Sequence, residues 1–137
     1  MREIKFRAWI INQHSNVIGG NNIFQSKEEM IYDFFKWKKP DFEEYRLDSC
    51  DDIFIMQFTG LEDKNGVEIY EGDIIQLQII NYLNKEELYN AEIIWSEDTT
   101  GFYIKSLCDG WCDDWDFSDS WRMKVIGNIY QNPELLK

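Results

Sequence analysis

Residues 56–75 read MQFTGLEDKNGVEIYEGDII, and this stretch decides the fold class. Asp63-Lys64-Asn65-Gly66 fits a type I turn closed by a glycine in the left-handed region, with strand-like residues on both sides. Glu71-Gly72-Asp73 marks a second reversal. The stretch therefore predicts strand, tight turn, strand, turn and strand. The three predicted strands span 53–59, 67–70 and 74–80.

The strand pattern continues toward the C-terminus. Further strands are predicted over 89–95, 102–107 and 122–130, and one helical turn over 133–136. Strand 74–80 is apolar or amide on both faces, so we expect it at the centre of its sheet. Short strands at such close spacing are typical of a small β barrel or roll.

The N-terminal third has a different pattern. Residues 2–11 alternate apolar and polar as in a half-buried strand, and the polar cluster 12–16 predicts a turn. Residues 26–39 predict a helix, since Ser26 and Glu29 form a capping box and the apolar residues follow at helical spacing. The expected fold is mainly β, a small barrel or roll with an N-terminal strand–helix extension, and α+β overall. The extension would take residues 1–52 and the barrel residues 53–137.

Composition indicates a folded protein. The 137 residues are 44% hydrophobic and 16% aromatic, which suits a chain that buries a core without disulfides or metals. No run approaches the roughly 20 apolar residues of a membrane span, and the N-terminus enters a strand pattern without a signal-peptide core. We therefore expect a cytoplasmic protein.

The cysteines do not form a metal motif. Cys50, Cys108 and Cys112 are an odd number, as expected for free thiols in a cytoplasmic chain. Zinc needs four ligands, and the Cys-x3-Cys pair has only the lone His14 to add to it. We expect neither a metal nor a cofactor.

Charge is uneven along the chain, whose net charge is −12. Residues 1–40 carry seven Lys/Arg against four Asp/Glu, and residues 41–137 carry seven against 22. Binding to a nucleic-acid backbone needs clustered basic residues, so this acidic balance argues against it and favours basic protein partners.

Residues 109–119 have the most unusual composition, with five aspartates and three aromatic residues in eleven positions. Three interpretations stay open: a solvated loop whose aromatics fold back on the barrel, a protein-binding surface, and a Ca²⁺ site. The aspartate spacing does not follow the EF-hand order, which disfavours calcium. A tryptophan-anchored, carboxylate-rimmed surface would select basic partners. The candidate partner-binding residues are Trp111, Asp113, Asp114, Trp115 and Asp116.

Catalytic motifs are absent from the sequence. It contains no G-x-S-x-G, no phosphate-binding glycine loop and no H-E-x-x-H, and His14 lies in a polar segment. We expect a protein that is not an enzyme. The runner-up to protein binding is a nucleic-acid-associated regulatory factor, in which exposed aromatics stack bases beside an N-terminal basic patch. That patch would consist of Arg2, Lys5, Arg7, Lys36, Lys38 and Lys39.

Three blocks of sequence, MREIKFRAW, MQFTGLEDKNGVEIYEGDII and VIGNIYQNPELL, resemble the YopX family of phage and prophage proteins. The blocks occur in the family's order and span nearly the whole chain. The resemblance implies an SH3-like barrel in the later strands, a phage or prophage origin, and self-association. It implies no activity and carries over no functional residue. The shared positions are turn and core residues: Gly60, Asp63, Gly66, Gly72, Asp73, Gly127 and Pro133.

These lines converge on a non-enzymatic phage accessory protein. We expect it to work through contacts with a protein partner, either a second copy of itself or a basic host or phage protein, and to form a homo-oligomer.

Overall fold

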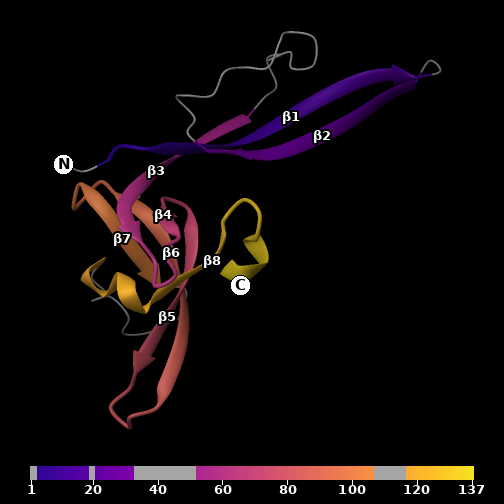
Figure 1. Cartoon of the computed structure of the whole chain (residues 1–137). Helices are drawn as coiled ribbons and strands as arrows, with labels where there is room; N and C mark the ends of the chain where they lie inside the picture. The colour runs from indigo at the N-terminus through magenta and orange to yellow at the C-terminus, as the bar shows by residue number, and fades with distance from the viewer. Residues whose placement is uncertain (1–2, 19–20, 33–51, 107–116) are drawn as a thin grey trace. The chain divides into compact units, whose positions relative to one another are not determined.

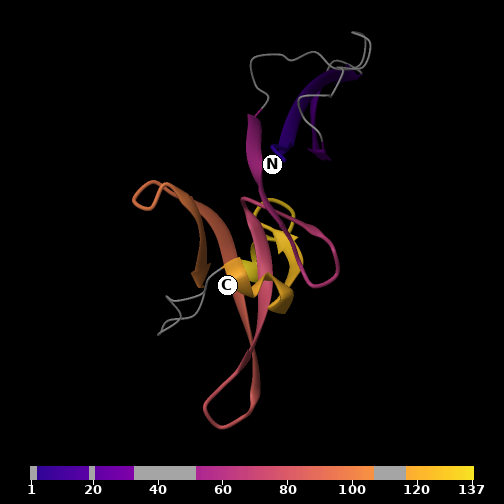
Figure 2. The same ribbon diagram turned by 60° about the vertical axis from the view of Figure 1, so that its left-hand side comes forward.

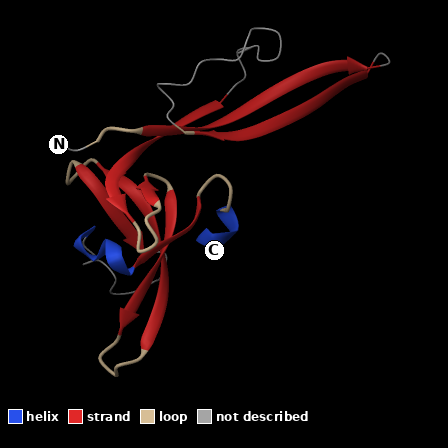
Figure 3. Cartoon of the chain, in the orientation of Figure 1, coloured by secondary structure: helices blue, strands red, loops and turns tan. Residues whose placement is uncertain are grey.

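The computed structural model describes residues 3–18, 21–32, 52–106 and 117–137, without the side chains of 12–18, 21–27 and Asp119 (Figure 1). The chain divides into two compact units, residues 5–57 and residues 58–137 with 1–4. The described residues are mainly β, in two antiparallel sheets, and their helix is confined to two short 3-10 segments (Figure 3). The expectation of a mainly β fold is confirmed, and the described residues contain no N-terminal helix.

The unit of residues 5–57 is built on a long ribbon of two strands, β1 (Phe6–Ile18) and β2 (Asn21–Ile31). The first half of β3 (Asp52–Glu62) pairs with the base of β1, from Phe6↔Gln57 to Ile11↔Asp52. Among the described side chains of this unit, the buried ones lie where β1 pairs with β3: Arg7, Ala8, Trp9, Ile10 and Met56. The strand predicted over residues 2–11 is therefore present, but it begins at Phe6 and continues to Ile18, beyond the alternating residues.

The turn expected at residues 12–16 is wrong. These residues continue β1 and pair with β2 from Asn12↔Lys27 to Asn16↔Ile23. Ile18 pairs with Asn21, so only Gly19-Gly20 separates the two strands. Two glycines between paired strands are a stronger hairpin signal than a polar run such as residues 12–16, because a strand can also contain asparagine and glutamine.

The helix expected from Ser26 is also wrong over residues 26–31, which belong to β2. Ser26 pairs with Gln13 and Met30 with Trp9, so the backbone groups meant for a helical turn bond instead to β1. A capping box is worth about 1 kcal/mol, which a continuous ladder of hydrogen bonds outweighs. Residues 33–39 of that helix lie outside the described part of the chain.

The second unit contains a four-stranded sheet in the order β7-β6-β5-β8 (Figure 2). Its strands are β5 (Asp73–Ile80), β6 (Glu86–Ser96), β7 (Gly101–Ser106) and β8 (Met123–Asn128). β5 pairs with both β6 and β8, which confirms the central place predicted for it. The short strand β4 (Glu68–Tyr70) pairs with the second half of β3. The helical segments are η2 (Phe117–Arg122) and η3 (Pro133–Leu136), the latter as predicted.

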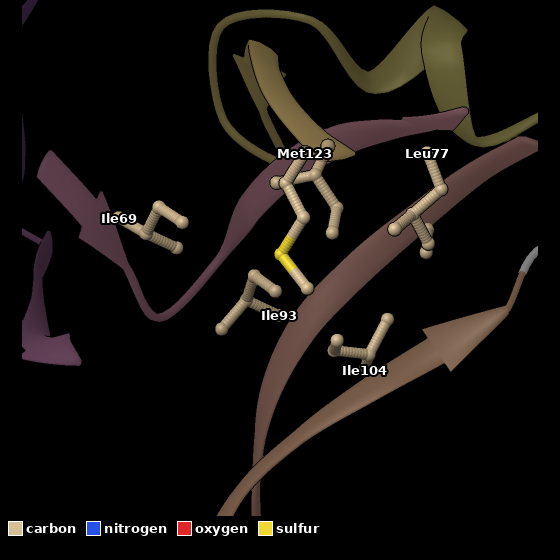
Figure 4. Packing of buried hydrophobic residues seen from close by; sticks show 7 residues of the cluster. Ile69, Leu77, Ile93, Ile104 and Met123 are labelled. Carbon is tan, nitrogen blue, oxygen red and sulfur yellow. The ribbon is translucent and has the colours of Figure 1, made fainter. Parts of the chain in front are cut away.

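A single apolar cluster holds this unit together, and Figure 4 shows its side chains converging. Its members are Ile69, Ile75, Leu77, Ala91, Ile93, Ile104 and Met123, each at most 2% exposed. They come from five strands, so the cluster joins all of them. Burial of each larger side chain contributes roughly 1.5–3 kcal/mol.

The turn at Asp63–Gly66 has the predicted geometry. Gly66 N donates to the carbonyl oxygen of Asp63 at 3.0 Å, and Gly66 has a φ of 77°, which glycine adopts without strain. The Asp63 carboxylate is buried and accepts three backbone hydrogen bonds, from Asn65 N (2.7 Å), Val67 N (3.0 Å) and Val125 N (2.9 Å). One side chain thus closes the turn and attaches it to β8.

The second reversal, at Gly72, is hydrogen-bonded to two other segments of the chain, β6 and the residue that follows β8. Gly72 N donates to Ile93 O at 2.8 Å, and Gly72 O accepts from Ile129 N at 2.9 Å. Asp73 is 1% exposed, and its Oδ2 accepts from Tyr70 N at 2.8 Å. These hydrogen bonds pair the polar groups of the corner with other groups of the protein.

No helix among the described residues is long and apolar enough to cross a membrane.

Candidate functional site

The residues predicted to bind a partner lie outside the described part of the chain. This applies to all five: Trp111, Asp113, Asp114, Trp115 and Asp116. The described residues on either side, Ser106 at the end of β7 and Phe117 at the start of η2, both belong to the second unit. The prediction for the segment between them stays a prediction.

One aromatic anchor follows this segment directly. Trp121 in η2 is 62% exposed, and the guanidinium carbon of Arg122 lies 4.3 Å from the centroid of its ring. An arginine over a tryptophan face is a cation–π pair, and both residue types are frequent in the energetic centres of protein interfaces. By contrast, Phe117 packs against the core cluster.

Some of the groups that the nucleic-acid hypothesis would use are buried. Arg7 is 5% exposed, and its guanidinium donates to Sδ of Met56 at 3.7 Å. Trp9 and Tyr70 are also buried, so neither offers a face to a base. Arg2, Lys36, Lys38 and Lys39 lie outside the described residues.

The described surface has a concentration of exposed apolar side chains at the end of the β5–β6 hairpin, residues 78–88, which we call the hairpin tip. β8 pairs with β5 only over 73–77 and β7 pairs with β6 only from residue 91 onward, so the tip is a two-stranded projection from the sheet (Figures 1 and 2). The exposed fractions are 65% for Ile80, 92% for Tyr82, 58% for Leu83 and 59% for Leu88.

Asn81 organises the turn that carries these side chains. Its Oδ1 accepts from Leu83 N at 2.9 Å and from Lys85 N at 3.0 Å, while Asn81 N donates to Lys85 O at 2.9 Å. Asn84 N donates to Asn81 O at 2.9 Å, and Asn84 has a φ of 56°, a region that asparagine tolerates. The turn is therefore closed by its own hydrogen bonds, although its apolar side chains face solvent.

Carboxylates flank the tip. The Tyr89 hydroxyl donates to Oε2 of Glu87, and Asn81 Nδ2 donates to Oε1 at 2.6 Å. These two hydrogen bonds, with a smaller attraction from Lys85, lower the pKa of Glu87 against an opposing effect of desolvation. Gln78 Nε2 donates to Glu86. The tip therefore combines these apolar side chains with the carboxylates of Glu86 and Glu87 and the ammonium group of Lys85.

In the described part of the chain, no group of three or more His, Cys, Asp or Glu could hold a metal ion.

The tip is suited to recognition of a partner through burial of Tyr82 and Leu83. Tyrosine combines a large apolar area with few rotatable bonds and a polar end, which suits it to interfaces.

The sequence analysis did not predict the tip, because its predicted strands end at residue 80 and resume only at residue 89. The available signal was the spacing of apolar residues: Ile80, Tyr82, Leu83 and Leu88 lie among Asn, Lys and Glu, where a solvated loop does not require them. Asn81 four residues before Lys85 was a second signal, because asparagine commonly closes such turns with its side chain.

Comparison with known proteins places the chain in a family. The profile described as YopX protein matches residues 5–137. The chain belongs to the YopX family. This confirms the family suggested by the three sequence blocks. No curated protein matches the chain. A solved structure that resembles it is the crystal structure of protein EF1440 from Enterococcus faecalis, with 26% sequence identity over 100% of both chains and a TM-score of 0.49.

Proposed function

We propose that this YopX-family chain is a non-enzymatic accessory protein of phage or prophage origin, and that it acts through protein–protein contacts in the bacterial cytoplasm. The observation that carries the proposal is the hairpin tip, which presents Tyr82 and Leu83 to solvent on a turn closed by Asn81. Membership of the YopX family supports the accessory role.

The energetics of the tip favour binding. Burial of Tyr82 and Leu83 in a partner would contribute roughly 1.5–3 kcal/mol for each side chain. Association also costs free energy when mobile loops become ordered. The hydrogen bonds of Asn81 already order this turn, so a larger part of the burial energy would appear as affinity.

The partner surface that fits best is an apolar pocket with a basic rim. Glu86 and Glu87 stand beside the apolar side chains, and the chain as a whole carries −12. Opposite charge around a pocket would speed encounter and orient the hairpin. We assign the segment with Trp111, Asp113, Asp114, Trp115 and Asp116 the same kind of partner, as an additional contact.

We also propose that the strands from β3 to β8 form an SH3-like barrel. Lys64 N donates to Met123 O at 3.0 Å and Asp63 Oδ2 accepts from Val125 N at 2.9 Å, so the turn that follows β3 meets the edge of the sheet at β8. This contact supports closure on the β8 side.

The test compares capture of partners by wild type and by a Tyr82→Ser/Leu83→Ser variant, from lysate of the bacterium that carries the gene. We expect at least one protein to bind wild type and to be recovered at least tenfold less with the variant, because loss of even one of the two burial contributions, roughly 1.5–3 kcal/mol, predicts that change. The matched control is Val67→Ser, because Val67 is an exposed apolar residue (47%) in a different turn of the same unit. A Trp111→Ala/Trp115→Ala variant measures the second contact. Recovery of the same proteins in equal amounts by wild type, the tip variant and the control would refute the proposal.

A further inference from the structure

The ribbon of β1 and β2 contains a long run without charge. From Ala8 to Ser26 there are 19 consecutive residues without Asp, Glu, Lys or Arg, in a chain that is 29% charged. Exposed edge strands are usually protected by charged residues or proline. The ribbon has neither over those 19 residues, and the charged residues of β2 are confined to Lys27, Glu28 and Glu29.

Among the described residues, no strand pairs with the outer edge of β2. Within the described residues β2 pairs only with β1, along its full length from Asn21 to Ile31, and beyond Ile11 β1 pairs only with β2. Every second residue of an edge strand directs its N–H and C=O groups outward, which makes about five residues of β2 available. A two-stranded ribbon is only marginally stable in water, and a third strand stabilises it.

We infer that β2 pairs edge to edge with β2 of a second copy of the chain, antiparallel and about a two-fold axis near Ser26, the middle residue of the strand. Such an interface is closed, because the same edge serves both copies. Its hydrogen bonds join the sheets of the two copies, each in the order β2-β1-β3-β4, into one continuous sheet.

The charges of β2 favour the antiparallel arrangement. With Ser26 opposite itself, Lys27 falls opposite Gln25 of the second copy, and Glu28 and Glu29 fall opposite Phe24 and Ile23. No two like charges are paired across this ladder. A parallel arrangement would place each glutamate beside its own copy, which destabilises a sheet.

Net charge favours a second copy over a basic partner at this edge. Two chains of −12 repel each other, and the repulsion is smallest where they meet through uncharged segments. A basic protein would gain little along this edge, since Asn21 to Ser26 contain no carboxylate and Glu28 and Glu29 stand beside Lys27. The inference rests on the proposed role in protein contacts, but it uses a different unit and a different surface from the hairpin tip.

The experiment is a charge exchange at the axis. Ser26→Lys and Ser26→Glu each place two like charges opposite one another in the pair, so each variant alone should raise the Kd of self-association by about fivefold relative to wild type. An equimolar mixture of the two variants places Lys opposite Glu and should recover the wild-type Kd. Sedimentation velocity over a series of concentrations measures all of these on the purified full-length chain.

The matched controls are Thr99→Lys and Thr99→Glu, at an exposed turn position of the other unit, and they should leave the Kd unchanged. Three results would overturn the inference. Wild type could be monomeric at all concentrations, which leaves the edge to another protein. The Ser26 variants could associate as wild type does, or the mixture could fail to recover association. Lysate capture by the hairpin tip is independent of all three, so the failure of one proposal is distinguishable from failure of the other.

Discussion

Asp63 shows how one residue of the family's central block acts as scaffold. Its carboxylate is buried, with 6% of the residue exposed, yet each oxygen is occupied: Oδ1 by Asn65 N and Val67 N, Oδ2 by Val125 N. Val125 is 62 residues away in sequence, so the side chain joins a local turn to the last strand. A buried carboxylate in this position serves the fold and needs no ligand.

Replacement of Asp63 should be costly. Asp63→Ala leaves three backbone N–H groups without their acceptor, and we expect a loss of about 2–4 kcal/mol in the free energy of unfolding by urea. Asp63→Asn keeps one acceptor oxygen but places an amide N–H₂ against a backbone N–H, so an intermediate loss is expected. The control Asp98→Ala, in an exposed turn, should change stability by less than about 0.5 kcal/mol. Equal stability of Asp63→Ala and the control would contradict the role described.

The same carboxylate should make stability depend on pH. Burial acts to raise the pKa of Asp63, but hydrogen bonds from Val125, Val67 and Asn65, with Lys64 nearby, outweigh it and lower the pKa below its ordinary value. Because the folded pKa is the lower one, the stabilisation is fully present above the unfolded pKa of about 4 and is lost as pH falls through the folded value.

The pH effect is isolated by the difference in unfolding free energy between wild type and Asp63→Asn. That difference should be constant near neutral pH and should shrink as pH falls below about 4. A difference that stays constant through the acid range would show that the ionised carboxylate contributes nothing.

At the scale of elements, the hairpin tip separates local order from global stability. Asn81→Ala removes the acceptor of two backbone hydrogen bonds. These bonds lie at the end of a two-stranded projection, beyond Leu77, the last residue of β5 in the core cluster. We expect exchange of the Leu83 and Lys85 amides to become about tenfold faster, while the melting temperature changes by no more than a few degrees. Asn81→Asp retains the acceptor and should keep slower exchange. Unchanged exchange in Asn81→Ala would mean that the side chain does not order the turn.

The elements also show where sequence reasoning succeeded. Reversals at Asp63–Gly66 and Gly72 were predictable because glycine in the left-handed region and an aspartate at the turn act within a few residues. The strand β2 was not, because Ser26, Glu29 and the apolar spacing satisfy helical rules locally. These residues form a strand because they pair with β1, and a local sequence pattern carries no information about that partner.

At the scale of the whole molecule, the fold was more predictable than the site. The family and the β class follow from residues spread over nearly the whole chain, and the profile match over residues 5–137 confirms the family. The candidate contact surface depends on which apolar side chains remain exposed, and Tyr82 differs from buried Tyr70 only in its tertiary surroundings. Alternation predicts which residues share a face of a strand, but the pairing of other strands decides which face is covered.

The charge of the molecule frames both proposals. A chain of −12 favours basic partners at the hairpin tip, where Glu86 and Glu87 stand beside Tyr82, and restricts contacts between copies to uncharged segments such as Ala8–Ser26. The two surfaces belong to different units, so each can be altered while the other is kept.

The most direct measurement of the central claim, protein contact through the hairpin tip, is site-specific photocrosslinking in the bacterium that carries the gene. Tyr82 is replaced by the photoreactive phenylalanine analogue p-benzoylphenylalanine, which preserves an exposed aromatic ring, and the same analogue replaces Val67 as control. We predict discrete covalent adducts with another protein from position 82 that are absent from position 67. No adduct from position 82, or the same adducts from both positions, would contradict the claim.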